Sequence, residues 1–261
     1  MTVTLQRRGA VATIELNRPD AMNAWNREFG DELRTVVERT AADADVRAVV
    51  ITGAGRGFSA GADLKDPGFN LTPKGHPDVR QALTERYHPI ITGIREMPKP
   101  VVAAVNGPAA GIGCSLALAC DLVIAAESAF FMLAFVNIGL VPDGGSSFLI
   151  PAKVGFARAA EMALLGERVP APKALEWGLI NKVVPGDELR GEVDALADRL
   201  AQGPTRSYAG SKRQLNAWLY SRMHEQLELE ASIQQEMAAS GDFAEGVQAF
   251  VEKRPARFTG S

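Results

Sequence analysis

The sequence has few cysteines and no long uninterrupted apolar run. Its two cysteines, Cys114 and Cys120, lie in one apolar stretch with a spacing that does not suit metal ligands. We therefore expect buried, unreactive thiols, a reducing compartment and a cytoplasmic protein. Asp121 and Glu127 interrupt the longest apolar stretch, and none reaches the roughly 18–20 residues that a membrane span needs. No apolar signal core precedes the first strand-like pattern, so no signal peptide is expected.

Basic residues are not in excess either. The chain has 28 Lys and Arg against 31 Asp and Glu, which gives a net charge of −3. Because phosphate binding needs a basic excess or stripe, nucleic acid is not expected as a main partner. The three histidines, His76, His88 and His224, are scattered, so no metal site is expected. With 261 residues and 46% hydrophobic content, the chain can form one large domain, or a domain with an appendage.

Strand and helix patterns alternate as far as Val184, and only helical patterns follow. This change predicts an α/β body with a helical C-terminal piece. The expected strands cover 2–5, 11–16, 46–52, 101–105 and 180–184. The expected helices cover 26–42, 79–97, 115–120, 157–165, 172–177, 188–202, 204–219, 221–239 and 242–253, with Asp242 as the N-cap of the last. The helices from Pro204 onward carry apolar faces that we expect to pack on the body or on another subunit.

Two glycine-rich turns bracket the central stretch 106–147. The first, at 107–113, lies between a strand and a helix, where free backbone N–H groups and the helix dipole favour an anion. The second, at 139–145, carries Asp143 directly before Gly144. We hypothesise that both turns face one pocket, in which one turn holds an anion and the other moves a proton. Asp121, at the end of the central helix, is interpreted as a structural carboxylate.

Two other loops are less informative. The loop 53–61, GAGRGFSAG, fits neither a dinucleotide-binding turn followed by a long helix nor a P-loop. The segment 67–77 is rich in proline, glycine and polar residues and is expected to be a surface loop.

Four motifs resemble the crotonase (enoyl-CoA hydratase/isomerase) superfamily and occur in that family's order. They are GAGRGFSAGADL at 53–64, VNGPAAGIGCSLALACD at 105–121, IGLVPDGGSS at 138–147 and FVEKRPARF at 250–258. The resemblance implies a spiral of ββα turns over residues 1–200 and a C-terminal helical trimerisation region over residues 201–261. It also implies an acyl-CoA thioester substrate, no cofactor beyond that coenzyme A, and a homotrimer or dimer of trimers.

The resemblance further implies an oxyanion hole for the thioester carbonyl. By motif position its donors are the backbone N–H groups of Ala62 and Ile112, and Ile112 keeps this N–H although the family usually has glycine there. Asp63 suits a turn or cap role equally well, and Lys253 suits a solvated side chain equally well. In the family a neighbouring subunit's C-terminal segment reaches the coenzyme. Contacts to substrate or coenzyme A are therefore expected from Ala60, Gly61, Asp63, Leu64, Gly111, Phe135, Phe250 and Lys253.

Hydratases of this family use two glutamates to handle one water, and their positions correspond to Ser115 and Phe135 here. Their absence disfavours an ordinary hydratase. Asp143 resembles the acid of Δ3,Δ2-enoyl-CoA isomerases and of the ring-epoxide isomerase subgroup. One carboxylate suffices to take a proton at C2 and return it at C4, and nearby phenylalanines would raise its pKa. Asp143 could instead be a turn residue that bonds its own backbone.

The leading hypothesis is therefore a CoA-dependent isomerase that acts through Asp143. One alternative is a hydratase-type lyase in which Asp143 alone holds the water. The other is a non-catalytic acyl-CoA-binding or scaffold protein.

Overall fold

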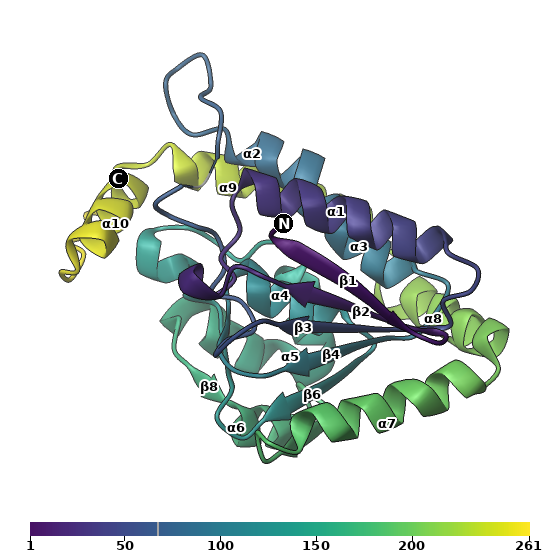
Figure 1. Ribbon diagram of the computed structural model, residues 1–261. Helices are drawn as coiled ribbons and strands as arrows, with labels where there is room; N and C mark the ends of the chain where they lie inside the picture. The colour runs from purple at the N-terminus through teal and green to yellow at the C-terminus, as the bar shows by residue number, and fades with distance from the viewer. Residues whose placement is uncertain (67) are drawn as a thin grey trace.

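The computed structural model describes residues 1–66 and 68–261, and a six-stranded sheet forms its centre (Figure 1). The strand order is β1-β2-β3-β4-β6-β9, with β1 and β2 antiparallel and all later neighbours parallel. The strands are β1 (Val3–Arg8), β2 (Val11–Leu16), β3 (Ala48–Gly53), β4 (Val101–Val105), β6 (Leu122–Ala126) and β9 (Lys182–Val184). A smaller sheet contains β5 (Ala109–Ala110), β7 (Phe130–Met132) and β8 (Val169–Pro170).

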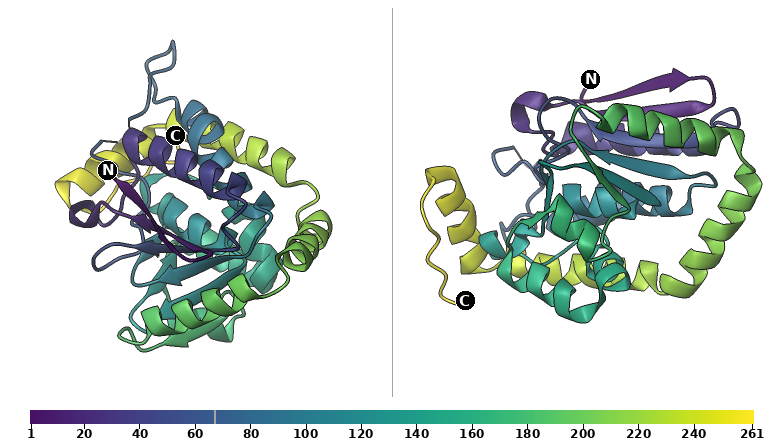
Figure 2. Two further views of the ribbon diagram at one scale, coloured as in Figure 1. Left: turned by 45° about the vertical axis from the view of Figure 1, so that its right-hand side comes forward. Right: turned by 90° about the horizontal axis from the view of Figure 1, so that it is seen from below.

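Helices bury both faces of the large sheet. Along β3, Val49 and Ile51 face the main core, whereas Ala48 and Val50 face a second core, as the twofold period of a strand requires. The main core is shared with α1 (Arg27–Ala42), α3 (His88–Glu96) and α4 (Ile112–Ala119), and the second with α7 (Leu189–Gln202). Figures 1 and 2 show α7 lying along its own face of the sheet. The predicted α/β class is confirmed.

Three helices close the chain, as the sequence predicts. They are α8 (Thr205–Leu219), α9 (Met223–Ala238) and α10 (Gly241–Glu252). In both figures α8 and α10 lie at opposite ends of the molecule, and α9 connects them. The predicted N-cap of α10 is wrong: Ser240 caps it by accepting the Phe243 N–H at 3.1 Å. Asp242 lies in the first turn, where its carboxylate accepts the Thr259 N–H at 2.7 Å.

Several helix boundaries differ from the predicted ones. The segment 79–97 divides into α2 (Val79–Ala82), a π-helical turn η2 (Leu83–Tyr87) and α3. The predicted helix 157–165 is the second half of α5 (Ser146–Leu165), which is kinked at Gly155. The remaining helices are α6 (Ala171–Glu176) and the short 3-10 turns η1 (Pro19–Ala21) and η3 (Ala134–Ile138). Residues 68–77 form a loop, and Pro67, the first residue of the predicted loop, lies outside the described residues.

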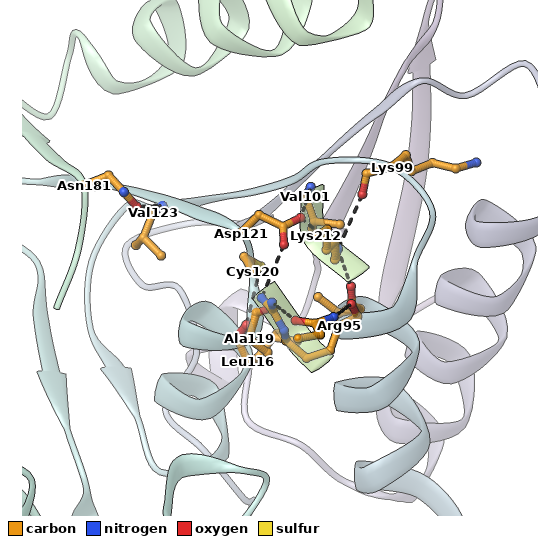
Figure 3. Close-up of polar contacts among 12 residues, drawn as sticks. Arg95, Lys99, Val101, Leu116, Ala119, Cys120, Asp121, Val123, Asn181 and Lys212 are labelled. Carbon is orange, nitrogen blue, oxygen red and sulfur yellow. Dashed lines mark hydrogen bonds and ion pairs between the residues drawn. The ribbon is translucent and has the colours of Figure 1, made fainter. Parts of the chain in front are cut away.

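A buried ion cluster anchors α8 to the body (Figure 3). Asp121 accepts hydrogen bonds from Lys212 Nζ at 2.8 Å and from the Val101 N–H at 2.9 Å. Arg95 Nη1 lies 3.3 Å from the other carboxylate oxygen. The Lys212 ammonium also donates to the Ile94 carbonyl at 2.7 Å. Asp121 therefore has the structural surroundings that the sequence suggests.

Within the described part of the chain, no helix is long and apolar enough to cross a membrane.

Candidate active site

Two loops meet at the edge of the sheet where the parallel strands end, the edge at which open α/β sheets bind ligands. Residues 54–66 follow β3, and residues 106–111, which include the short strand β5, follow β4. The loops are joined by backbone bonds, such as the Ala110 N–H to the Ser59 carbonyl at 2.9 Å. Gly61 has φ 94°, and a Cβ there would lie 2.9 Å from the Ala110 oxygen. The close approach of the two loops therefore requires glycine at this position.

The two loops border a cavity of about 240 Å³. Its wall is formed by the first loop, the start of α4, the turns η2 and η3, and the helices α9 and α10, among other segments. The cavity brings together most of the residues that the sequence predicts for the site: Ala60, Gly61, Ala62, Leu64, Gly111, Ile112, Phe135, Asp143 and Phe250.

The backbone N–H groups of Ala62 and Ile112 are both available at this cavity. Neither donates a hydrogen bond to any other part of the chain that the structure describes. Ile112 is the first residue of α4, where the helix dipole adds partial positive charge. Gly111 precedes it with φ 52° and ψ −129°, a conformation essentially restricted to glycine. This arrangement suits an oxygen that becomes negative.

Asp143 is a buried acid with one free oxygen. Its Oδ2 accepts a hydrogen bond from Gln234 Nε2 at 2.7 Å, and its Oδ1 has no partner among the described residues. Burial raises the pKa of Asp143 from 3.8 to about 8; the bond from Gln234 lowers this pKa, and the nearby Glu230 raises it. A carboxyl group with a pKa in this range can both accept and return a proton near neutral pH.

Helix α9 holds the turn that carries Asp143, a role that sequence reasoning missed. Gln226, Glu230 and Gln234 are spaced four residues apart and lie on one side of α9, against this turn. Gln226 donates to the Ser147 hydroxyl at 3.0 Å, and Glu230 accepts the Gly145 N–H at 2.8 Å. Burial raises the pKa of Glu230 from 4.5 to about 7. The spacing of these polar residues is a signal that the sequence contains.

Ser115 and Phe135, at the positions of the hydratase glutamates, bring no carboxylate to the cavity. The buried Ser115 hydroxyl donates to the Asp143 backbone carbonyl at 2.8 Å, and Phe135 lines the cavity. Tyr87, from η2, also lines it and packs edge-on against Trp25 with ring centroids 5.1 Å apart.

Asp63, Lys253 and Phe250 have different surroundings. Asp63 is not among the residues that line the cavity. Its carboxylate pairs with Arg18 at 3.0 Å and accepts the Lys65 N–H at 3.2 Å, as the carboxylate of a turn residue does. Lys253 is exposed at the end of α10, away from the cavity wall. Phe250 lines the cavity of its own chain, whereas the resemblance implies contact with a neighbouring subunit's coenzyme. No cluster of three metal-ligating side chains occurs among the described residues.

The fold and this site suit enzymes that stabilise an oxyanion beside a buried acid. A family profile described as enoyl-CoA hydratase/isomerase matches residues 6–261, so the chain belongs to that family, the crotonase family. The crotonase-like fold expected from the motifs, with its C-terminal helical region, is thereby confirmed.

Relatives of the chain include proteins named for both reactions. The chain is 45% identical to a protein of Rhodobacter capsulatus named probable enoyl-CoA hydratase, over 99% of this chain and 98% of that one. It is 42% identical to a 1,2-epoxyphenylacetyl-CoA isomerase of Escherichia coli, over 96% and 95%. A crystal structure of an enoyl-CoA hydratase from Mycobacterium avium subsp. paratuberculosis superposes with a TM-score of 0.90, at 41% identity and 99% coverage of both chains.

Proposed function

We propose that the protein is an acyl-CoA isomerase that moves a double bond from C3 to C2 of an enoyl-CoA, or rearranges a ring-derived acyl-CoA, with Asp143 as its base. One observation supports this most directly. Among the described residues that line the cavity, Asp143 is the one carboxylic acid, and it lines the same cavity as the two free backbone donors.

The proposed reaction is a proton transfer within one substrate. The Ala62 and Ile112 N–H groups hold the thioester oxygen, and Asp143 takes a proton from C2. The electron pair of that C–H bond moves onto the thioester oxygen, which gives a dienolate that the two donors stabilise. Asp143 then returns the proton to C4 and the electrons return, so that the double bond lies between C2 and C3. One carboxyl both takes the proton and returns it, so no second acid is needed.

A second candidate function is hydration of an enoyl-CoA. The relative named probable enoyl-CoA hydratase favours it. In this chain Asp143 alone would have to hold, deprotonate and deliver the water, because Ser115 and Phe135 replace the two glutamates expected of a hydratase. The third candidate, a non-catalytic acyl-CoA-binding protein, predicts binding without any proton transfer.

In the proposed complex coenzyme A is part of the substrate and no other cofactor takes part. The residues around the first loop, with Lys253, would contact the coenzyme. We further propose a cytoplasmic homotrimer or dimer of trimers, in which residues 201–261 make the subunit contacts.

Three assays on one preparation distinguish these functions. The first follows conversion of a 3-enoyl-CoA to the conjugated 2-enoyl-CoA, the second hydration of crotonyl-CoA, and the third uptake of deuterium from D₂O at the α-carbon of an acyl-CoA. The proposal expects conversion and uptake, with hydration at least about a hundredfold slower. Faster hydration would favour the lyase, and binding without either conversion or uptake would favour the non-catalytic protein.

A further inference from the structure

We propose that Gln234, on α9, is a positioning residue that clamps one oxygen of Asp143 and leaves the other as the atom that transfers the proton. This inference rests on the proposed function, since it gives Asp143 the role of the base. It assigns a role in the chemistry to the C-terminal helical region, which the sequence associates with subunit contacts.

The side-chain amide of Gln234 is fully used at the turn. Its Oε1 accepts the Val141 N–H at 3.0 Å, and its Nε2 donates to the Val141 carbonyl at 3.0 Å and to Asp143 Oδ2 at 2.7 Å. Gln234 is completely buried. Reversing the amide would set its NH₂ group against the Val141 N–H and its oxygen against two acceptors, so the bonds to Val141 fix which group faces Asp143.

This clamp distinguishes the two oxygens of Asp143. Oδ2 is held by Gln234, whereas Oδ1 has no partner in the described part of the chain. Two titratable groups are close enough to interact electrostatically with Asp143: Glu230, from α9, and Tyr87, from η2. Burial raises the pKa of Asp143 to about 8, and the hydrogen bond from Gln234 counteracts the rise because it stabilises the ionised form. Without this donor the carboxyl would hold its proton to higher pH.

Gln234→Met tests the clamp, because methionine has a similar length and no polar group. Gln234→Leu is a second variant, which is also apolar and loses both the donor and the acceptor of the amide. Gln226→Met is the matched control: Gln226 lies on the same side of α9 and donates to Ser147 at 3.0 Å without touching Asp143.

Two readouts are measured in all three variants. One is the pH dependence of kcat and KM for 3-enoyl-CoA isomerisation. The other is titration of the Asp143 carboxyl by infrared difference spectroscopy, with Asp143→Asn identifying its band. Both Gln234 variants should raise the Asp143 pKa by about 1 to 2, lower kcat at pH 7 about tenfold or more, and change KM less than about threefold. Gln226→Met should leave the Asp143 pKa as in the wild type, because Gln226 does not bond to Asp143.

The infrared titration needs no turnover, so the two proposals can fail separately. A wild type that binds acyl-CoA but does not isomerise it would overturn the proposed function. A Gln234→Met or Gln234→Leu protein whose Asp143 titrates as in the wild type would overturn the role of Gln234. An equal shift in Gln226→Met would also overturn it, because any weakening of the turn would then have the same effect.

Discussion

At the scale of single residues, the proposed chemistry depends on how the protein surrounds the Asp143 carboxyl. Burial favours the protonated form, the Gln234 amide favours the ionised form, and Glu230 opposes a second negative charge. The resulting pKa of about 8 lies far above the usual value of 3.8. An ordinary aspartate would be too weak a base for an α-carbon, so the elevated pKa fits the proposed proton transfer.

This elevated pKa predicts how Asp143 affects stability. Folding raises the pKa of Asp143 to about 8, so the wild type loses stability as pH rises from near 4 towards 8, because the buried carboxyl resists ionisation. The amide of the Asp143→Asn variant does not ionise. The melting temperature of this variant should therefore exceed that of the wild type by an amount that grows between pH 5 and pH 8, reaching several degrees. Calorimetry across this range checks it, and a constant difference would contradict it. Glu230 titrates in both proteins, so its contribution largely cancels.

The sequence predicts Asp143 as the base, but it does not reveal what controls it. The acid before two glycines is visible as a motif, and its elevated pKa could be expected from nearby phenylalanines. Its hydrogen-bond partner Gln234 lies 91 positions later. The sequence pattern of that helix reveals its apolar face, whereas the polar residues opposite the turn gain a meaning only when folding brings α9 against it.

At the scale of elements, the bounds of some strands are easier to predict than the helix ends, whereas β5, β6, β7 and β8 are not among the expected strands. Buried β-branched runs identify β3 and β4 to within two residues. Helix α4 begins at Ile112, three residues earlier than predicted, because glycines at its start disguise the first turn. That first turn matters for the proposed function, since it carries the Ile112 N–H. The π-helical turn η2 has no comparable sequence signal, although it places Tyr87 at the cavity.

The Asp121 cluster gives a prediction about how α8 is attached. Asp121→Asn keeps the shape but removes the charge that faces buried Arg95 and Lys212, and should lower the free energy of unfolding by about 3 kcal/mol or more. The control is Asp198→Asn, which removes an exposed pair with Arg8 and should cost less than about 1 kcal/mol. Urea denaturation measures both. Equal losses would contradict the structural role given to the cluster.

At the scale of the whole molecule, the C-terminal helices α8 and α9 differ in what they contact. One side of α9 holds the Asp143 turn, whereas α8 exposes Leu215, Trp218 and Leu219, with Trp218 84% exposed. These three lie on one side of α8 by their spacing. Apolar groups gathered in this way mark interaction surfaces. The sequence predicts this apolar face and a subunit contact. The division at residue 200 and the trimeric state stay predictions, because a single chain tests neither.

Analytical ultracentrifugation checks the oligomer. We expect the wild type to sediment as three or six copies of the 27.9 kDa chain. Trp218→Glu places a charge in the apolar face of α8 and should shift the protein to a smaller species at micromolar concentration. Ala217→Glu adds the same charge at an exposed position on another side of α8 and should leave the assembly intact. A monomeric wild type would contradict the proposed assembly, and an unchanged Trp218→Glu protein would exclude this face as the contact.

The most direct test of the central proposal is the rate at which Asp143→Asn converts a 3-enoyl-CoA to its conjugated 2-enoyl isomer, with acyl-CoA binding measured on the same protein. Asparagine keeps the shape and can still accept the bond from Gln234, but it cannot take a proton. We predict that kcat falls by about a thousandfold or more while the dissociation constant for acyl-CoA changes little. Turnover within about tenfold of the wild type would show that another group moves the proton.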